Sequence, residues 1–309
     1  MALNAITLGY AVPQNGFDAS IHSSFQSAAN LKLDGGRILL TLVISSETDL
    51  PQGIRVNTPK GFKFEDLQIN DRVICRDGTL RFEKSPMEID LRTAVRWECN
   101  LSAFSLETTS LLFSFAWMKV WQLLNDRQRN SGAEIVAENL LHPQDFQGSV
   151  LFRRLANGIA ELREATDHYD AKAAGVVSDL IGLGSGLTPS GDDLLVGYMA
   201  GLCSRTGENI TRKNFLSFLG KTLIVLSEKT TDISRTYLYH SARGQFSKNL
   251  AILAEAICKG MDTNRLYAIA ASAMKMGHTS GMDAVTGLLL GLSAWDGVQV
   301  HRQHSMDYL

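Results

Sequence analysis

The chain has almost no excess charge of either sign. Its 309 residues include 30 Lys and Arg against 32 Asp and Glu, which gives a formal net charge of −2. Nucleic acids and anionic membrane surfaces select strongly basic proteins, so this balance favours neither as a partner. Any charged ligand is therefore expected to be recognised by a local cluster of residues.

Cysteines and long apolar runs are also scarce. The cysteines, Cys75, Cys99, Cys203 and Cys258, are widely separated and form no C-x-x-C pair. This spacing favours reduced thiols in a cytosolic protein over a disulfide framework or a zinc site. The sequence begins without a secretion signal, and its apolar runs are far shorter than the roughly 20 residues that cross a bilayer. We therefore expect a soluble, cytoplasmic protein with no membrane partner.

The chain does contain enough apolar sequence, 45%, for a sizeable core. Up to about residue 100 it shows short β-branched segments between turn residues, and these predict strands at 37–46, 53–58, 71–76 and 94–99. Beyond about Leu106 the apolar period becomes helical, beginning with an apolar stripe at Leu111, Phe115, Met118 and Leu123. Further helices are predicted at 131–141, 147–166, 170–181, 190–205, 211–230, 244–258, 263–277 and 281–294. The sequence predicts an α+β protein, with a β-rich sheet or small barrel over 1–104 and a larger, mainly α-helical domain over 105–309.

The helical part carries one glycine-rich motif twice. Residues 182–202 read GLGSGLTPSGDDLLVGYMAGL, and residues 277–292 read GHTSGMDAVTGLLLGL. From Ser190 and Ser280 onward, both copies follow S-G-x-D-x-x-x-G-x-x-x-G-L. One interpretation is purely structural: the Ser and the Asp three residues later form a capping box, and the paired glycines let two helices cross closely.

A functional interpretation rests on the loop before the first copy. Alternating glycines just ahead of a helix present backbone N–H groups to an anion at the positive end of the helix dipole. The adjacent Asp192 and Asp193 argue against a bare phosphate cradle, because two carboxylates repel an anion unless a cation intervenes. At most one of them is needed for the cap. The other is free to bind Mg²⁺, position an amide or accept a proton.

Positive charge is available between the two copies. Arg235 and Arg243 lie in residues 230–246, and an arginine fork suits carboxylate or phosphate, although both could equally be solvated helix charges. We interpret His240 as a packing or capping residue. The chain has no G-x-x-x-x-G-K-[ST] and no H-E-x-x-H, and its G-x-G-x-G lies in a helical region, which disfavours a dinucleotide-binding fold.

The string GLGSGLTPSGDD, followed by ISRTYLYHSARG at 233–244 and GHTSGMD at 277–283, resembles the AllH family, formerly YlbF. The resemblance covers the C-terminal half, and residues 1–100 share only a β-rich character. It implies a subunit of oxamate carbamoyltransferase in anaerobic allantoin and purine breakdown. That enzyme converts oxalurate and phosphate to oxamate and carbamoyl phosphate, with FdrA-type and AllG-type subunits as partners.

The resemblance suggests roles for the motif residues. Asp192 and Asp193 are the candidate catalytic residues, which would orient an amide or a metal. Arg235 or Arg243 would neutralise charge that develops during transfer. The candidate substrate- and phosphate-binding residues are Gly184, Ser185, Gly186, Thr188, Ser190, Arg235, Arg243, His278, Thr279, Ser280 and Asp283.

Two other hypotheses stay open at this point. The first is a Mg²⁺-dependent hydrolase similar to ADP-ribosylglycohydrolases, which needs several carboxylates around its metals. The available ones are Asp192, Asp193, Asp232 and Asp283. The second is a non-catalytic scaffold whose glycine-flanked helices pack on a partner. No cofactor is certain, and Mg²⁺ is the candidate metal.

Overall fold

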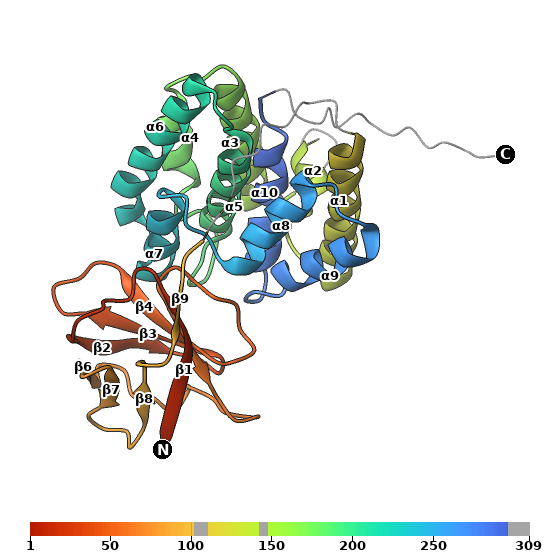
Figure 1. Cartoon of the computed structure of the whole chain (residues 1–309). Coiled ribbons are helices and arrows are strands. Elements are labelled where there is room, and N and C mark those ends of the chain that lie inside the picture. Colours follow the sequence, from red (N-terminus) through yellow and green to blue (C-terminus); the bar gives the residue numbers. More distant parts are fainter. Residues whose placement is uncertain (100, 102–110, 142–147, 296–309) are drawn as a thin grey trace.

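A computed structural model of the chain describes residues 1–99, 101, 111–141 and 148–295. Strands come first along the chain and helices follow (Figure 1). The strands are β1 (Ala2–Gly9), β2 (Phe17–Ser24), β3 (Ala28–Leu33), β4 (Leu39–Val43), β5 (Gly53–Asn57), β6 (Arg72–Arg76), β7 (Thr79–Phe82), β8 (Glu88–Asp90) and β9 (Val95–Trp97).

Eight of these strands close into a barrel. Their order is β5-β4-β3-β2-β6-β7-β8-β1, and β1 returns to pair with β5, while β9 adds to β1 in parallel. Closure pairs the edges that an open sheet would leave exposed. Alternate side chains point inward and fill the barrel, among them Ile21, Leu31, Leu42, Ile54 and Val73, all fully buried.

The predicted β-rich sheet or small barrel is confirmed. The four predicted strands correspond to β4, β5, β6 and β9, whereas β1, β2, β3, β7 and β8 were not predicted. Strand β2, with the sequence FDASIHSS, shows why. Its apolar alternation is limited to Phe17, Ala19 and Ile21 before the polar end of the strand, and its place is fixed by pairing on both sides, with β3 and with β6 about 50 residues farther along the chain.

The second part is helical, as predicted. Its helices are α1 (Leu111–Ser131), α2 (Ala137–Leu141), α3 (Val150–Asp167), α4 (Ala173–Leu180), α5 (Ser190–Arg205), α6 (Ile210–Leu226), α7 (Asp232–Ser241), α8 (Lys248–Cys258), α9 (Thr263–Ala273) and α10 (Ser280–Leu292). Helix α7 was not predicted. The predicted boundary at 104–105 falls outside the described residues, so the division into two domains stays a prediction.

None of the helices that the structure describes is long and apolar enough to span a membrane.

The two glycine-rich copies form a close crossing of α5 and α10 at the centre of the helical core. A Cβ atom on Gly197 would lie 1.8 Å from the Ala284 carbonyl oxygen, and one on Gly287 would lie 2.0 Å from that of Leu194. Only glycine permits this approach, because the neighbour in each case is backbone. The crossing predicted from the spacing of the glycines is therefore confirmed.

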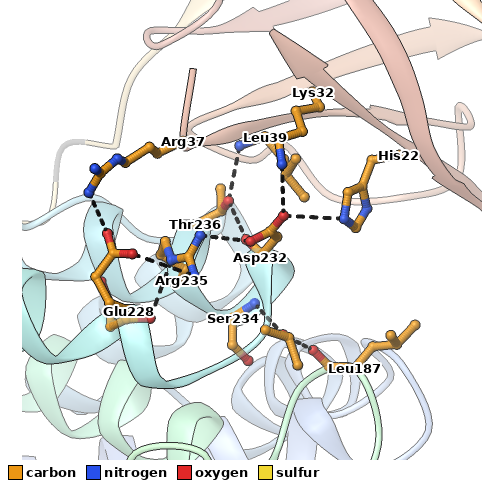
Figure 2. Close-up of polar contacts among 12 residues, drawn as sticks. His22, Lys32, Arg37, Leu39, Leu187, Glu228, Asp232, Ser234, Arg235 and Thr236 are labelled. Atoms are coloured by element: carbon orange, nitrogen blue, oxygen red, sulfur yellow. Dashed lines mark hydrogen bonds and ion pairs between the residues drawn. The ribbon is translucent and has the colours of Figure 1, made fainter. Parts of the chain in front are cut away.

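Helix α7 connects the helical part to the barrel through ion pairs (Figure 2). Asp232, its first residue, accepts Lys32 and His22 from strands β3 and β2, each at 3.4 Å. Just before α7, Glu228 pairs with Arg37 at 2.9 Å. Partly exposed pairs of this kind contribute about 0–1 kcal/mol each, so they serve mainly to orient the two parts.

Buried and partly buried hydrogen bonds reinforce the same junction. The Leu39 N–H of β4 donates to the Thr236 hydroxyl of α7 at 3.1 Å, as Figure 2 shows. At the start of α8, the Lys248 N–H donates to the Asp49 carbonyl at 3.0 Å. The barrel and helices α7 and α8 thus meet through specific contacts.

Candidate functional site

A cavity of about 310 Å³ lies where the barrel meets the helices. Strands β3 and β4 and the loop after β4 form one side, and α5, α7, α10 and the start of α8 form the other. Most of the lining is apolar, with polar groups that include Asn30, Glu47, Thr188, Asp193, Tyr237 and His240. No Lys or Arg lines it among the described residues. An apolar cavity with a few buried polar groups is typical of a small-molecule site.

Asp193 lies in the wall of this cavity, and among the described residues one oxygen of its carboxyl group lacks a hydrogen-bond partner. The residue is 7% exposed, and its Oδ2 atom has no hydrogen-bond partner among the described residues. Burial, followed by the negative charge of Asp283, raises the pKa of Asp193 well above its usual range. Hydrogen bonding by Ser280 and Thr188 offsets part of this rise. A buried acceptor that lacks a partner is costly, so the site favours a ligand donor or a proton there.

Asp283 is the counterpart of Asp193 in the second copy of the motif. It is 3% exposed, and within the described residues its Oδ2 atom also has no partner. Burial raises its pKa to about 6, and hydrogen bonding by Ser190 and Thr279 works in the opposite direction. Each aspartate is thus approached by the threonine of its own copy and the serine of the other.

The predicted capping boxes are wrong. Helix α5 begins at Ser190, its N-cap is Pro189, and no side chain caps it; α10 likewise begins at Ser280 without a side-chain cap. Because each serine lies inside its helix, its hydroxyl serves the helix crossing instead of its own first turn. Thr188 and Ser280 hydrogen bond to each other at 2.7 Å between their hydroxyl oxygens.

Asp192 is an anchor for the glycine-rich loop. It is 1% exposed, its Oδ1 atom accepts the Gly182 N–H at 2.8 Å, and its Oδ2 atom accepts the Thr230 hydroxyl. The sequence interpretation placed Asp193 in a capping box and left Asp192 free. In the structure, Asp192 uses both of its oxygens in hydrogen bonds, whereas among the described residues Asp193 Oδ2 has no partner. A catalytic role for either aspartate stays a prediction.

The glycine-rich loop before α5 has the predicted irregular backbone. Gly182, Gly184 and Gly186 have φ of 74°, 130° and 88°. Ser185, Gly186 and Leu187 are exposed, and the amides from Gly184 to Leu187 donate no backbone hydrogen bond within the described residues. The Thr231 hydroxyl ties the end of the loop to the start of α7 by donating to the Leu187 carbonyl at 2.6 Å. These amides are available for an anion, although anion binding stays a prediction.

The structure does not bring the predicted cations into the cavity. Arg235 pairs with Asp232 at 2.7 Å and with Glu228 at 3.8 Å, as Figure 2 shows. Arg243 lies over the ring of Tyr239, 4.3 Å from its centroid. His278 is exposed in the turn before α10. The binding roles of these residues stay predictions, and among the described residues none of the three lines the cavity.

Helix α7 supplies two cavity residues that the sequence interpretation missed as functional candidates. His240 is 2% exposed, its Nδ1 atom lies 3.0 Å from the Tyr10 hydroxyl, and its Nε2 atom has no partner within the described residues. Burial and the charge of Arg243 lower its pKa to about 4, so it is neutral near pH 7. One turn earlier, burial and the charges of Asp193 and Glu47 raise the pKa of Tyr237 to about 12. Tyr237 and His240 are three residues apart, so a prediction of α7 would have placed them on the same face of that helix.

No group of three or more His, Cys, Asp or Glu side chains that could hold a metal ion occurs among the described residues. Asp232, one of the carboxylates considered for a Mg²⁺ site, instead pairs with Lys32, His22 and Arg235. The hydrolase hypothesis therefore gains no support from the arrangement of the carboxylates.

Comparison with known families decides the assignment. A model of the family described as oxamate carbamoyltransferase subunit AllH matches residues 180–292, and a model of the AllH family N-terminal domain matches residues 4–96. The chain belongs to the AllH family. Membership supports a subunit of that enzyme, and hence the existence of other protein subunits. No solved structure matches the chain. The AllH match contains both glycine-rich copies and α7, and the N-terminal match covers nearly the whole barrel.

Proposed function

We propose that the chain is the AllH subunit of a carbamoyl-transferring enzyme of the oxamate carbamoyltransferase type and that the cavity binds its substrate. The reaction converts oxalurate and phosphate to oxamate and carbamoyl phosphate in allantoin breakdown, in the cytoplasm, with FdrA-type and AllG-type subunits as partners. The observation that carries the assignment of the site is the buried carboxyl oxygen of Asp193, which has no hydrogen-bond partner among the described residues. It belongs to the motif within the AllH match and lies in a cavity shared by both matched parts.

The chemistry of the cavity suits an amide or ureido group. A carboxyl oxygen accepts an amide N–H, and the neutral imidazole of His240 offers one ring nitrogen for a second hydrogen bond. The apolar surroundings strengthen such bonds, because water does not compete for them. An uncharged, planar group with several donors and acceptors therefore fits better than a free anion.

The anionic part of the substrate is assigned to the glycine-rich loop. No Lys or Arg among the described residues lines the cavity, so a carboxylate or phosphate needs another source of positive potential. The amides from Gly184 to Leu187 and the start of α5 provide one, and Thr188 and Ser190 add hydroxyls. Leu187 and Thr188 of the loop line the cavity, which supports assigning the two parts of one small ligand to these neighbouring regions.

The scaffold hypothesis gains no specific support. The glycine faces of α5 and α10 pack on each other within the chain, so they are not surfaces for a partner helix. A partner subunit is expected to bind elsewhere.

Replacing Asp193 with Asn tests the proposed site. In the enzyme reconstituted with its partner subunits, we expect Asp193→Asn to lower turnover of oxalurate with phosphate by about 100-fold or more, as removal of an acid–base group does. Melting should change little, because Asn has the same shape and carries no buried charge. The measurement is the rate of carbamoyl phosphate formation together with a melting curve.

Two variants control for the loss of a carboxylate as such. Asp179→Asn, at an exposed position on α4, should leave both activity and melting unchanged. Asp192→Asn should lower the melting temperature, because it weakens the anchor to Gly182 and Thr230. Full activity of Asp193→Asn would reject the proposed site.

A further inference from the structure

The crossing of α5 and α10 brings two buried carboxyl groups into electrostatic contact. The charge of Asp283 acts on Asp193. The hydroxyls of the two motif copies interlock: Ser280 and Thr188 hydrogen bond Asp193, Ser190 and Thr279 hydrogen bond Asp283, and the hydroxyl oxygens of Thr188 and Ser280 lie 2.7 Å apart. Both Oδ2 atoms are buried without a partner among the described residues. The two residues occupy equivalent positions in the motif, so the repeat itself builds the pair.

Among the described residues, none of the groups that shift the pKa of Asp193 or Asp283 is positively charged. The charged and titratable groups that act on Asp193 are Asp283 of α10 and Asp192 of α5, while Tyr237 of α7 senses both Asp193 and Glu47. Because these acids all become negative on ionisation, ionising one of them makes ionisation of the others less favourable. Two buried carboxyls in such a setting retain one proton between them, because like charges in a low-dielectric site cannot both ionise readily.

A second, independent observation points to a ligand at the same place. The Nε2 atom of His240 is buried, unpartnered among the described residues and part of the cavity wall that also contains Asp193. The Tyr10 hydroxyl engages the other ring nitrogen and so fixes the imidazole in position. Two unsatisfied groups, one on α5 and one on α7, therefore line a single cavity.

We propose that Asp193 and Asp283 share one proton and that Asp193 donates it to the leaving nitrogen of the carbamoyl donor. Asp283 is a positioning residue that keeps the proton on the pair. His240 forms a hydrogen bond with the bound carbamoyl donor. This inference rests on the proposed function, because it assigns a step of that reaction.

The proposed step balances as follows. An unprotonated oxygen of hydrogen phosphate attacks the carbamoyl carbon of oxalurate, and a carbon–oxygen bond forms. The bond from this carbon to the nitrogen that bears the oxalyl group breaks. That nitrogen takes the proton of Asp193, which releases oxamate. The carbamoyl phosphate first formed still carries the proton of the attacking phosphate. Transfer of that proton to Asp193 restores the pair and leaves the dianionic product.

The pH dependence of turnover tests the role of Asp283. In the reconstituted enzyme, the rate should fall at high pH as the pair loses its shared proton. Asp283→Asn removes the neighbouring charge, so the midpoint of the fall in kcat should move to a lower pH by about one unit or more. At any pH above both midpoints, the variant should then turn over about tenfold more slowly than the wild type. The KM for oxalurate should change by less than about 3-fold, since uniform binding is retained. An unchanged pH profile in Asp283→Asn, with Asp179→Asn as control, would overturn the inference.

A spectroscopic measurement separates this inference from the proposed function. In the full-length protein without ligand, infrared spectra should show a protonated carboxyl whose disappearance with rising pH occurs at a lower pH in Asp283→Asn than in the wild type. The same midpoint in both proteins would overturn the pair even if oxalurate is turned over. A lower midpoint in Asp283→Asn than in the wild type, found together with no turnover of oxalurate by the reconstituted wild-type enzyme, would support the pair and reject the proposed function.

Discussion

Replacing Gly197 with Ala is expected to destabilise the protein by about 3 kcal/mol or more, the upper end of what overpacking a core costs. The added Cβ would lie 1.8 Å from the Ala284 carbonyl oxygen and 2.7 Å from its carbon. These are backbone atoms of α10, so no side-chain rotation can relieve the clash. The two helices must separate, which disrupts the core around Leu194 and Leu288, both fully buried. Urea unfolding or the yield of soluble protein measures the effect.

Gly175 provides a matched control. It lies in helix α4, and a Cβ added there would meet no atom within 4 Å. Gly175→Ala should therefore be neutral or stabilising by about 0.5–1 kcal/mol, because alanine has the higher helix propensity. A Gly197→Ala protein as stable as Gly175→Ala would show that α5 and α10 do not cross closely.

The second large effect is a loss of stability as the pH rises. The pKa of Asp283 is raised from 3.8 to about 6 in the folded protein, so the folded state binds its proton more tightly than the unfolded state does. The resulting stabilisation is fully present below pH 3.8 and is lost as the pH rises through about 6. It amounts to about 3 kcal/mol at most, from 1.36 kcal/mol per pKa unit. Asp193 and Asp192, whose pKa values are also raised, act with the same sign.

Urea unfolding of the wild type and of Asp283→Asn, at about pH 4.5 and about pH 7.5, measures this contribution as a difference of differences. The comparison is needed because the lowered pKa values of Asp49 and Asp232 act in the opposite direction in both proteins. We expect Asp283→Asn to gain stability relative to the wild type at the higher pH, whereas Asp179→Asn should not. Equal pH dependence in wild type and Asp283→Asn would contradict the buried pair.

The sequence predicts the parts of the fold that depend on local pattern. The strands around 53–57 and 72–76 and the long helices stand out because their periodicity is continuous. Helix α7 does not, because it has only 10 residues and three of its polar ones serve contacts to the barrel or the loop: Asp232, Thr236 and His240. Short helices gain their stability from tertiary packing, which no local window contains.

The site shows the same division. The helix crossing was predictable from the glycine pairs Gly197/Gly201 and Gly287/Gly291, because each pair lies one turn apart on one face of its helix. The roles of Asp192 and Asp193 were not predictable, because both lie in the first turn of one helix and differ only in what each faces. Asp192 faces Gly182 and Thr230, whereas Asp193 faces the other copy of the motif and the cavity.

Ligand binding to the cavity is the most direct test of the central claim that substrate binds where the barrel meets the helices. Thermal stabilisation should be measured with phosphate, oxamate, oxalurate and carbamoyl phosphate on the wild type and on Ala28→Phe, which fills the cavity from strand β3. At about 100 times its dissociation constant, a ligand should add roughly 2.7 kcal/mol to the wild type. It should add nothing to Ala28→Phe, while Ala171→Phe, at an exposed turn, should respond as the wild type does. Equal stabilisation of Ala28→Phe, or none of the wild type by any of the four compounds, would contradict the claim.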